Sequence, residues 1–145
     1  MRMRSTLILP GVAALGLSAA LAWQDAPAPS ASLQVTRAVA CLEIRDREPV
    51  SIDSVFSNQT PRIYCHTQIE GAAEPVEIQH VWIHNGEEKA AVKLMVRGSP
   101  WRTYSSKTML PEWTGAWKVE IRDAAGSVLK SVEFSVTEKE GAEGS

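Results

Sequence analysis

The sequence has little excess charge of either sign and no long run of like charge. Lys and Arg number 15 against 17 Asp and Glu, so the formal net charge is -2, and no run of like charge exceeds Glu87-Glu88. A protein whose main partner is nucleic acid or an anionic membrane surface needs a basic field. The charge therefore argues against both partners, and the 44% of hydrophobic residues is ordinary for a globular protein.

After residue 22 the chain also lacks sustained helical periodicity and internal repeats. Hydrophobic and polar residues instead alternate with a period of two, and turn signals such as Asn85-Gly86 separate the alternating segments. The segment 50–60, bracketed by Pro49 and Pro61, is expected to be an irregular crossing loop with room for a short helical turn at 53–56. We therefore predict an all-β, immunoglobulin-like antiparallel β-sandwich of about seven strands. The predicted strands span residues 35–44, 63–69, 76–84, 92–96, 101–107, 117–122 and 128–136.

Residues 1–22 have the pattern of a secretory signal peptide. Arg2 and Arg4 precede an apolar segment at 7–21, and Ala20-Leu21-Ala22 is a small-x-small cleavage site. The alternative is an uncleaved membrane anchor, although the apolar run is short for a spanning helix. We expect an exported protein, periplasmic or secreted, that meets a membrane only through an uncleaved signal. The remaining divisions are a disordered Ala/Pro/Ser linker at 23–32, a β-sandwich domain at 33–137 and a disordered tail at 138–145.

Cysteine is scarce, with only Cys41 and Cys65, and each lies on a predicted strand. In an oxidising compartment two cysteines favour a disulfide, which would stabilise the fold by about 3 kcal/mol in the chain-entropy model. The alternative is a pair of buried free thiols, which pack as small hydrophobic side chains.

Signatures of catalysis and metal binding are also scarce. His80 and His84 are four residues apart, which on a strand separates them by about 13 Å, too far for one ion. His66 could approach His80 from a neighbouring strand, but no further ligand is placed to complete a site. The sequence has no Gly-x-Ser-x-Gly turn. We expect no metal, no cofactor and no enzyme activity, with a periplasmic hydrolase using His80 and Ser105 as the alternative.

Aromatic, cationic and hydroxyl side chains concentrate in residues 99–107. On a strand, Trp101, Thr103 and Ser105 share one face and the residues between them share the other. Because stiff aromatic rings and arginine are common in recognition surfaces, we predict that this stretch binds a protein or glycan of the cell envelope. The predicted binding residues are His80, Trp101, Arg102, Tyr104 and Ser105, with Trp82 and Trp117 beneath them.

A purely structural role for Arg102 is the competing interpretation. Its guanidinium group would then tie a crossing strand to the sandwich by gripping the carboxylate of Glu48 or a loop carbonyl. The two interpretations differ in whether an Arg102→Ala variant loses stability or only binding.

Several short motifs occur in a fixed order along the chain, at residues 37–41, 46–49, 63–65, 80–82, 101–107, 115–120 and 123–126. Together they resemble the bacterial family called domain of unknown function 2914. The resemblance implies a protein that is often exported or membrane-attached and has no settled activity. It also implies that some of these residues belong to a shared architecture, and we assign structural roles to Arg47, Glu48, Pro49, Trp82 and Trp117. Within the same architecture it places His80, Trp101, Arg102 and Ser105.

Overall fold

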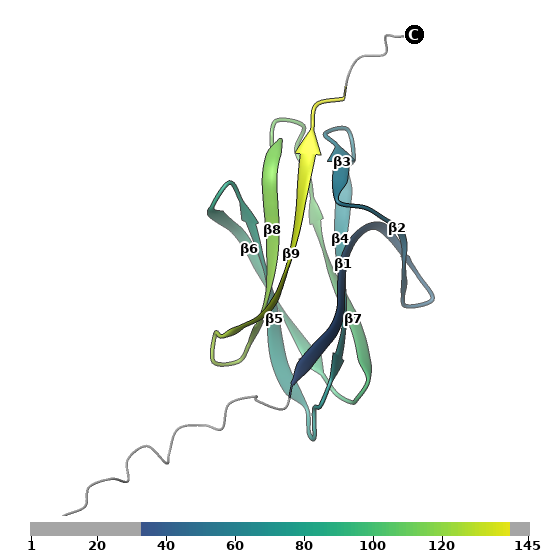
Figure 1. Ribbon diagram of the computed structural model, residues 1–145, viewed down its shortest axis with the longest axis vertical. Coiled ribbons are helices and arrows are strands. Elements are labelled where there is room, and N and C mark those ends of the chain that lie inside the picture. Colours follow the sequence, from purple (N-terminus) through teal and green to yellow (C-terminus); the bar gives the residue numbers. More distant parts are fainter. Residues whose placement is uncertain (1–32, 140–145) are drawn as a thin grey trace, which may run out of the picture.

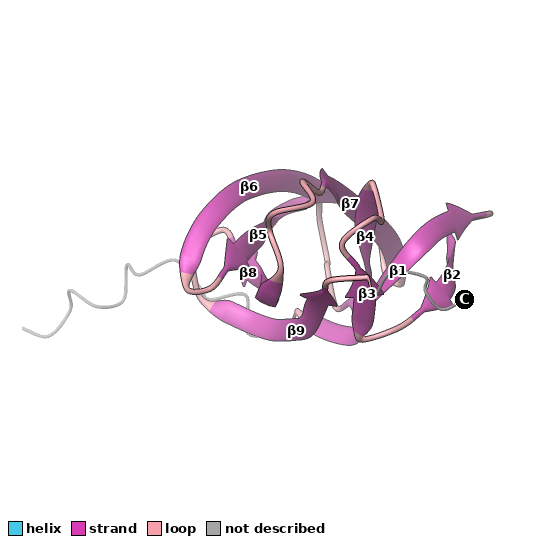
Figure 2. Ribbon diagram, turned by 90° about the horizontal axis from the view of Figure 1, so that it is seen from above, coloured by secondary structure: helices cyan, strands magenta, loops and turns pink. Residues whose placement is uncertain are grey.

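The computed structural model describes residues 33–139, which form a β-sandwich of two facing sheets (Figures 1 and 2). The predicted all-β fold class is confirmed, and the described residues contain no helix, hence none that could span a membrane. The predicted signal peptide, the linker and the tail from residue 140 lie outside the described residues. The strands are β1 (Gln34–Arg45), β2 (Glu48–Ile52), β3 (Val55–Ser57), β4 (Arg62–Glu70), β5 (Val76–His84), β6 (Glu87–Val96), β7 (Trp101–Thr108), β8 (Gly115–Asp123) and β9 (Val128–Thr137).

The strand order is that of an immunoglobulin-like sandwich. One sheet has the order β2-β1-β4-β7 and the other β3-β9-β8-β5-β6. All neighbouring strands are antiparallel except β3 and β9, which are parallel. When the short strands β2 and β3 are left out of the count, the first, second and fifth strands (β1, β4 and β7) form one sheet, and the third, sixth and seventh (β5, β8 and β9) lie in the other. Immunoglobulin domains divide their strands in the same way. Here β7 and β6 end their sheets on the same side of the sandwich, so each has a free edge among the described residues (Figure 2).

The core lies between the sheets and is built from alternate residues of the central strands. On β8, Trp117, Val119 and Ile121 are at most 2% exposed. On β5, Trp82 is fully buried, and its ring meets that of Phe134 edge to face with centroids 6.3 Å apart. Burying one large apolar side chain contributes about 1.5–3 kcal/mol. Trp82 and Trp117 therefore both belong to the core, as the sequence led us to expect.

The segment 50–60 differs from the prediction, because strands β2 and β3 replace the expected loop and helical turn. β2 pairs with the second half of β1 through a tight turn whose residues Asp46 and Arg47 have φ of 53° and 66°. Two consecutive left-handed residues make the turn type that suits the twist of a hairpin. Farther along, Phe56 is buried and packs edge to face on Phe134, which fixes β3 beside β9.

The two cysteines differ from the predicted disulfide, because both are free and buried thiols. In the pairing of β1 with β4, Cys65 lies opposite Ala40 rather than Cys41. Directly paired residues share a face of the sheet, and successive residues alternate between faces, so Cys41 and Cys65 point to opposite faces. Burial raises the pKa of both thiols.

Candidate functional site

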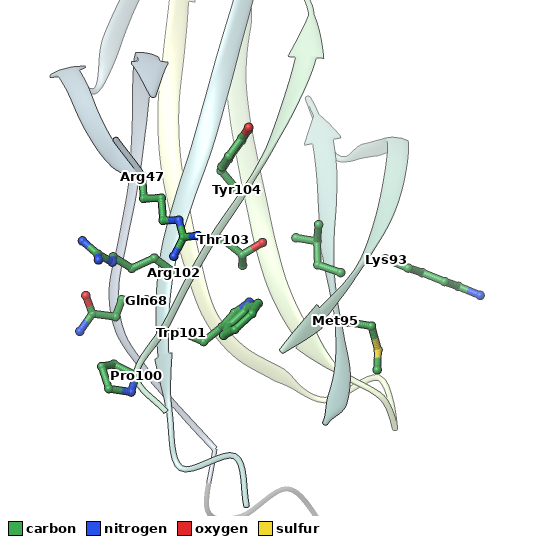
Figure 3. Close-up of a pocket in the computed structure, with 10 residues that line it drawn as sticks. Arg47, Gln68, Lys93, Met95, Pro100, Trp101, Arg102, Thr103 and Tyr104 are labelled. Carbon is green, nitrogen blue, oxygen red and sulfur yellow. The ribbon is translucent and has the colours of Figure 1, made fainter. Parts of the chain in front are cut away.

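A cavity of about 630 Å³ lies along the edge of β7, on the side of the sandwich that β6 also borders (Figure 3). Residues 100–104 line it from the β7 side and residues 93–95 from β6, while Arg47 and Gln68 complete the lining. In a strand, successive side chains point to opposite faces, so consecutive residues can share one cavity only where it follows the strand edge. The cavity is therefore bordered by the backbone of β7 as well as by its side chains.

The aromatic part of this cavity is Trp101, at the first position of β7. Figure 3 shows its ring extending from β7 toward β6. The ring is half-buried, and the Gly98 backbone approaches it so closely that an added Cβ would lie 3.4 Å from the ring atom Cε3. Leu94 and Met95 add apolar surface on the β6 side. This part of the cavity can take an apolar group or the flat face of a ring.

The charged part of the cavity is cationic, although the whole chain has a net charge of -2. Arg47, Lys93 and Arg102 line it, and no acidic residue does. Figure 3 shows Arg47 reaching from the β1–β2 turn toward β7, while Lys93 extends outward from the β6 rim. Among residues 33–139, neither Arg47 nor Lys93 has a carboxylate within salt-bridge distance. The Arg47 guanidinium group is thus available to an anionic ligand in the cavity, whereas the Lys93 amino group points away from Trp101 and β7 (Figure 3).

Arg102 is already engaged, because its guanidinium group binds the carboxylate of Glu48. The second oxygen of the same carboxylate lies 3.4 Å from Arg37 Nη1. Nearby, His66 donates from Nε2 to the carbonyl oxygen of Arg47 at 2.9 Å. These contacts hold the β1–β2 hairpin against β4 and β7. This is the contact expected if Arg102 is a structural tie.

A chain of hydrogen bonds between the sheets links β5 with β7 and β4 and ends on the backbone of β7. Trp82 Nε1 lies 3.2 Å from Ser105 Oγ, Ser105 Oγ lies 2.6 Å from His80 Nδ1, and His80 Nε2 lies 3.2 Å from Thr67 Oγ1. Thr67 Oγ1 in turn lies 3.5 Å from the carbonyl oxygen of Thr103. The indole N–H can only donate and the carbonyl can only accept. Every hydrogen bond in the chain therefore points from Trp82 toward Thr103.

This direction defines the state of His80. Its Nδ1 accepts from the Ser105 hydroxyl and its Nε2 carries the proton donated to Thr67, so the ring is neutral. Burial lowers the pKa of His80 to about 4, in keeping with a neutral ring. Each side-chain polar atom of Trp82, Ser105, His80 and Thr67 therefore has a hydrogen-bond partner. A buried network must be satisfied in this way if it is not to cost stability.

The predicted binding surface is therefore divided between two places. Trp101, Arg102 and Tyr104 line the cavity. His80 is fully buried and Ser105 is 6% exposed, so both lie between the sheets and neither meets solvent as a contact residue would. Alternation along β7 places Ser105 on the same face as Trp101, which does line the cavity, so the sequence pattern could not separate the two residues.

Other lining residues carried no sequence signal. Lys93 lies on a different strand from the aromatic stretch, and Gln68 lies near the end of β4. Arg47 was assigned a structural role only. Their approach to Trp101 depends on which strands lie at the edges of the sheets and on how the β1–β2 hairpin folds back. The alternation of residues along a single strand predicts neither feature.

Residues 75–136 match the model of the family described as "Protein of unknown function (DUF2914)". The family resemblance is confirmed over these residues. The DUF2914 match runs from the start of β5 into β9 and includes Trp101, Arg102 and the buried pair His80 and Ser105. Arg47 lies outside the matched residues. No curated protein matches the sequence.

Proposed function

We propose that this chain is an exported, non-enzymatic binding module, and that it binds a protein or glycan of the cell envelope in the cavity between β6 and β7. The observation that carries the proposal is the cavity of about 630 Å³, which combines the Trp101 ring with the unengaged guanidinium group of Arg47. Its size lies within the range usual for ligand sites. An aromatic ring with a few placed polar groups is also the usual composition of such sites.

Hydrolysis by His80 and Ser105 is the second candidate, favoured by their 2.6 Å contact. Several features oppose it. Both side chains are buried, and neither lines the cavity. The position that a carboxylate holds in a catalytic triad is taken by the Thr67 hydroxyl, and the Trp82 N–H donates to the oxygen that would have to attack. A fluorophosphonate probe tests this candidate, because labelling that Ser105→Ala abolishes would establish the hydrolase and contradict our proposal.

The binding proposal is tested by affinity capture from envelope extract. We compare the wild-type protein with Trp101→Ala and with the matched control Trp113→Ala. Trp113 is also half-buried and near two cations, Lys89 and Lys107 at 5.3 and 5.0 Å, but it does not line the cavity. We expect Trp101→Ala to lose the captured partner and Trp113→Ala to retain it, with thermal unfolding run on each variant to show that it is folded. Equal capture by wild type and a folded Trp101→Ala would contradict the proposal.

A further inference from the structure

The backbone at the edge of β7 offers the cavity hydrogen-bonding groups in addition to those of the side chains. β7 ends its sheet, and residues 101–104 all border the cavity. In the antiparallel pairing with β4, the N–H and C=O groups of alternate residues point away from β4, so those of every second residue in 101–104 face the free edge without a neighbouring strand among residues 33–139. A free edge of this kind is a template for one more strand. Adding an extended peptide to such an edge is a recurring mode of recognition, in which main-chain hydrogen bonds supply affinity.

The two faces of β7 at this edge differ in chemistry. Trp101 is on the inner face, near Leu94 of β6, and Arg102 and Tyr104 are on the outer face, toward Arg47. Side chains of an added strand would alternate between the same two faces. One set would meet apolar surface and the other would meet the unengaged guanidinium group of Arg47, so the edge favours a strand in which apolar and acidic residues alternate.

We infer that the cavity takes an extended segment of a partner protein, with alternating apolar and acidic residues, as an added strand on β7. This inference rests on the proposed function and makes it more specific, because it selects a protein over a glycan. Four residues of β7 and the four residues of the added strand that would pair with them each span about 13 Å. Charge complementarity comes from Arg47, which no carboxylate among the described residues engages. Specificity for apolar positions comes from the Trp101 ring.

The experiment uses the purified protein and a fluorescent Val-Glu-Val-Glu-Val-Glu peptide as the probe. Its controls are the Val-Lys peptide of the same length and the Val-Glu peptide with alternate backbone nitrogens methylated, which removes donors but keeps the charge. We expect the acidic peptide to bind, and the Val-Lys and methylated peptides to bind at least about tenfold more weakly, the effect of about 1.4 kcal/mol. Binding should also slow hydrogen exchange of amides within residues 101–104.

Arg47→Gln supplies the test within the protein, with Arg45→Gln as its matched control. Arg45 belongs to the same hairpin but lies outside the cavity and pairs with Glu43 at 2.8 Å. We expect Arg47→Gln to weaken binding of the acidic peptide severalfold and Arg45→Gln to leave it unchanged. Equal effects of the two variants would show that general charge, and not the edge site, attracts the probe, and would overturn the inference.

An anionic oligosaccharide, oligogalacturonate, separates this inference from the function on which it rests. If oligogalacturonate binds, Trp101→Ala abolishes that binding and the acidic peptide does not bind, the inference is wrong while the proposed function stands. If neither probe binds, the inference is again wrong, and capture from envelope extract decides the proposed function separately. Protection of residues 101–104 that rises with protein concentration alone would assign the edge to a second copy of the chain and overturn the inference.

Discussion

His80 shows how one buried residue sets both the stability and the chemistry of its surroundings. Because its neutral ring accepts at Nδ1 and donates at Nε2, it joins Ser105 of one sheet to Thr67 of the same sheet while itself lying on the other. Protonation would place a donor on Nδ1, against the Ser105 hydroxyl that donates to it. To accept from a protonated Nδ1, the Ser105 hydroxyl would have to give up its present donation to the ring. The positive charge of the buried imidazolium would then have no carboxylate to stabilise it among the described groups that hydrogen-bond to the ring.

We predict that the free energy of unfolding falls as the pH is lowered from about 6.5 toward 4. The pKa of His80 is lowered from 6.5 to about 4 in the folded protein, so the unfolded chain binds more protons in this interval and stability rises with pH. The full contribution is present above pH 6.5, and its loss by pH 4 is about 3 kcal/mol. Urea unfolding at several pH values measures this change. His80→Gln should be less stable at pH 7 and should show a smaller loss over the same interval; an unchanged slope would contradict the assignment.

Arg102 is a second residue whose role depends on its exposure. It binds Glu48, but the side chains are 40% and 45% exposed. Exposed ion pairs contribute about 0–1 kcal/mol. We therefore predict that Arg102→Ala lowers the free energy of unfolding by no more than about 1 kcal/mol, as urea unfolding would measure. A double-mutant cycle with Glu48→Gln should give a coupling of similar size, and a loss of several kcal/mol would require a buried network at this position.

At the scale of elements, the turn of the β1–β2 hairpin places a left-handed residue beside the cavity. Arg47 has a φ of 66° although it is not glycine, and its carbonyl anchors His66 while its side chain lines the cavity. Non-glycine residues in this backbone region are uncommon, and they are found in tight turns and at ligand-binding sites. The hairpin turn accounts for the conformation of Arg47, and our proposal adds a ligand-binding role for its guanidinium group.

A glycine at this position separates stability from binding. Glycine adopts the left-handed conformation without strain, and the main-chain carbonyl that His66 uses is kept. We predict that Arg47→Gly changes the free energy of unfolding by less than about 1 kcal/mol, in the stabilising direction, while it weakens binding of the acidic peptide. Urea unfolding and fluorescence anisotropy measure the two effects. A large loss of stability would show that the Arg47 side chain supports the fold.

The elements that alternate cleanly were predictable, and those that do not were missed. β5 spans Val76–His84 as predicted, because its inward residues repeat every second position and Asn85-Gly86 ends it. β2 and β3 were missed because they are short, with five and three residues. Pro49, which we interpreted as the start of a loop, lies within β2. The turn that creates β2 uses Asp46 and Arg47 in a conformation that glycine and asparagine usually signal.

At the scale of the whole molecule, the cavity follows from the strand order. β6 and β7 end their sheets on one side of the sandwich, which leaves their edges facing a common opening. Alternation along β7 predicted which side chains share a face, but only the assembled sheets show that Ser105 faces His80 across the core while Trp101 reaches the edge. Which strands become edges is a property of topology, so the sequence alone could not bring Lys93 and Arg47 to Trp101.

The most direct measurement is a map of backbone amide chemical shifts while the ¹⁵N-labelled protein is titrated with the partner captured from envelope extract. Our account predicts that the perturbed amides cluster in residues 93–95 and 100–104, which line the cavity, and that Trp101→Ala abolishes the shifts while Trp113→Ala retains them. Shifts that instead cluster on β8 and β9, with the cavity residues unchanged, would contradict the claim that the open side of the sandwich is the binding site.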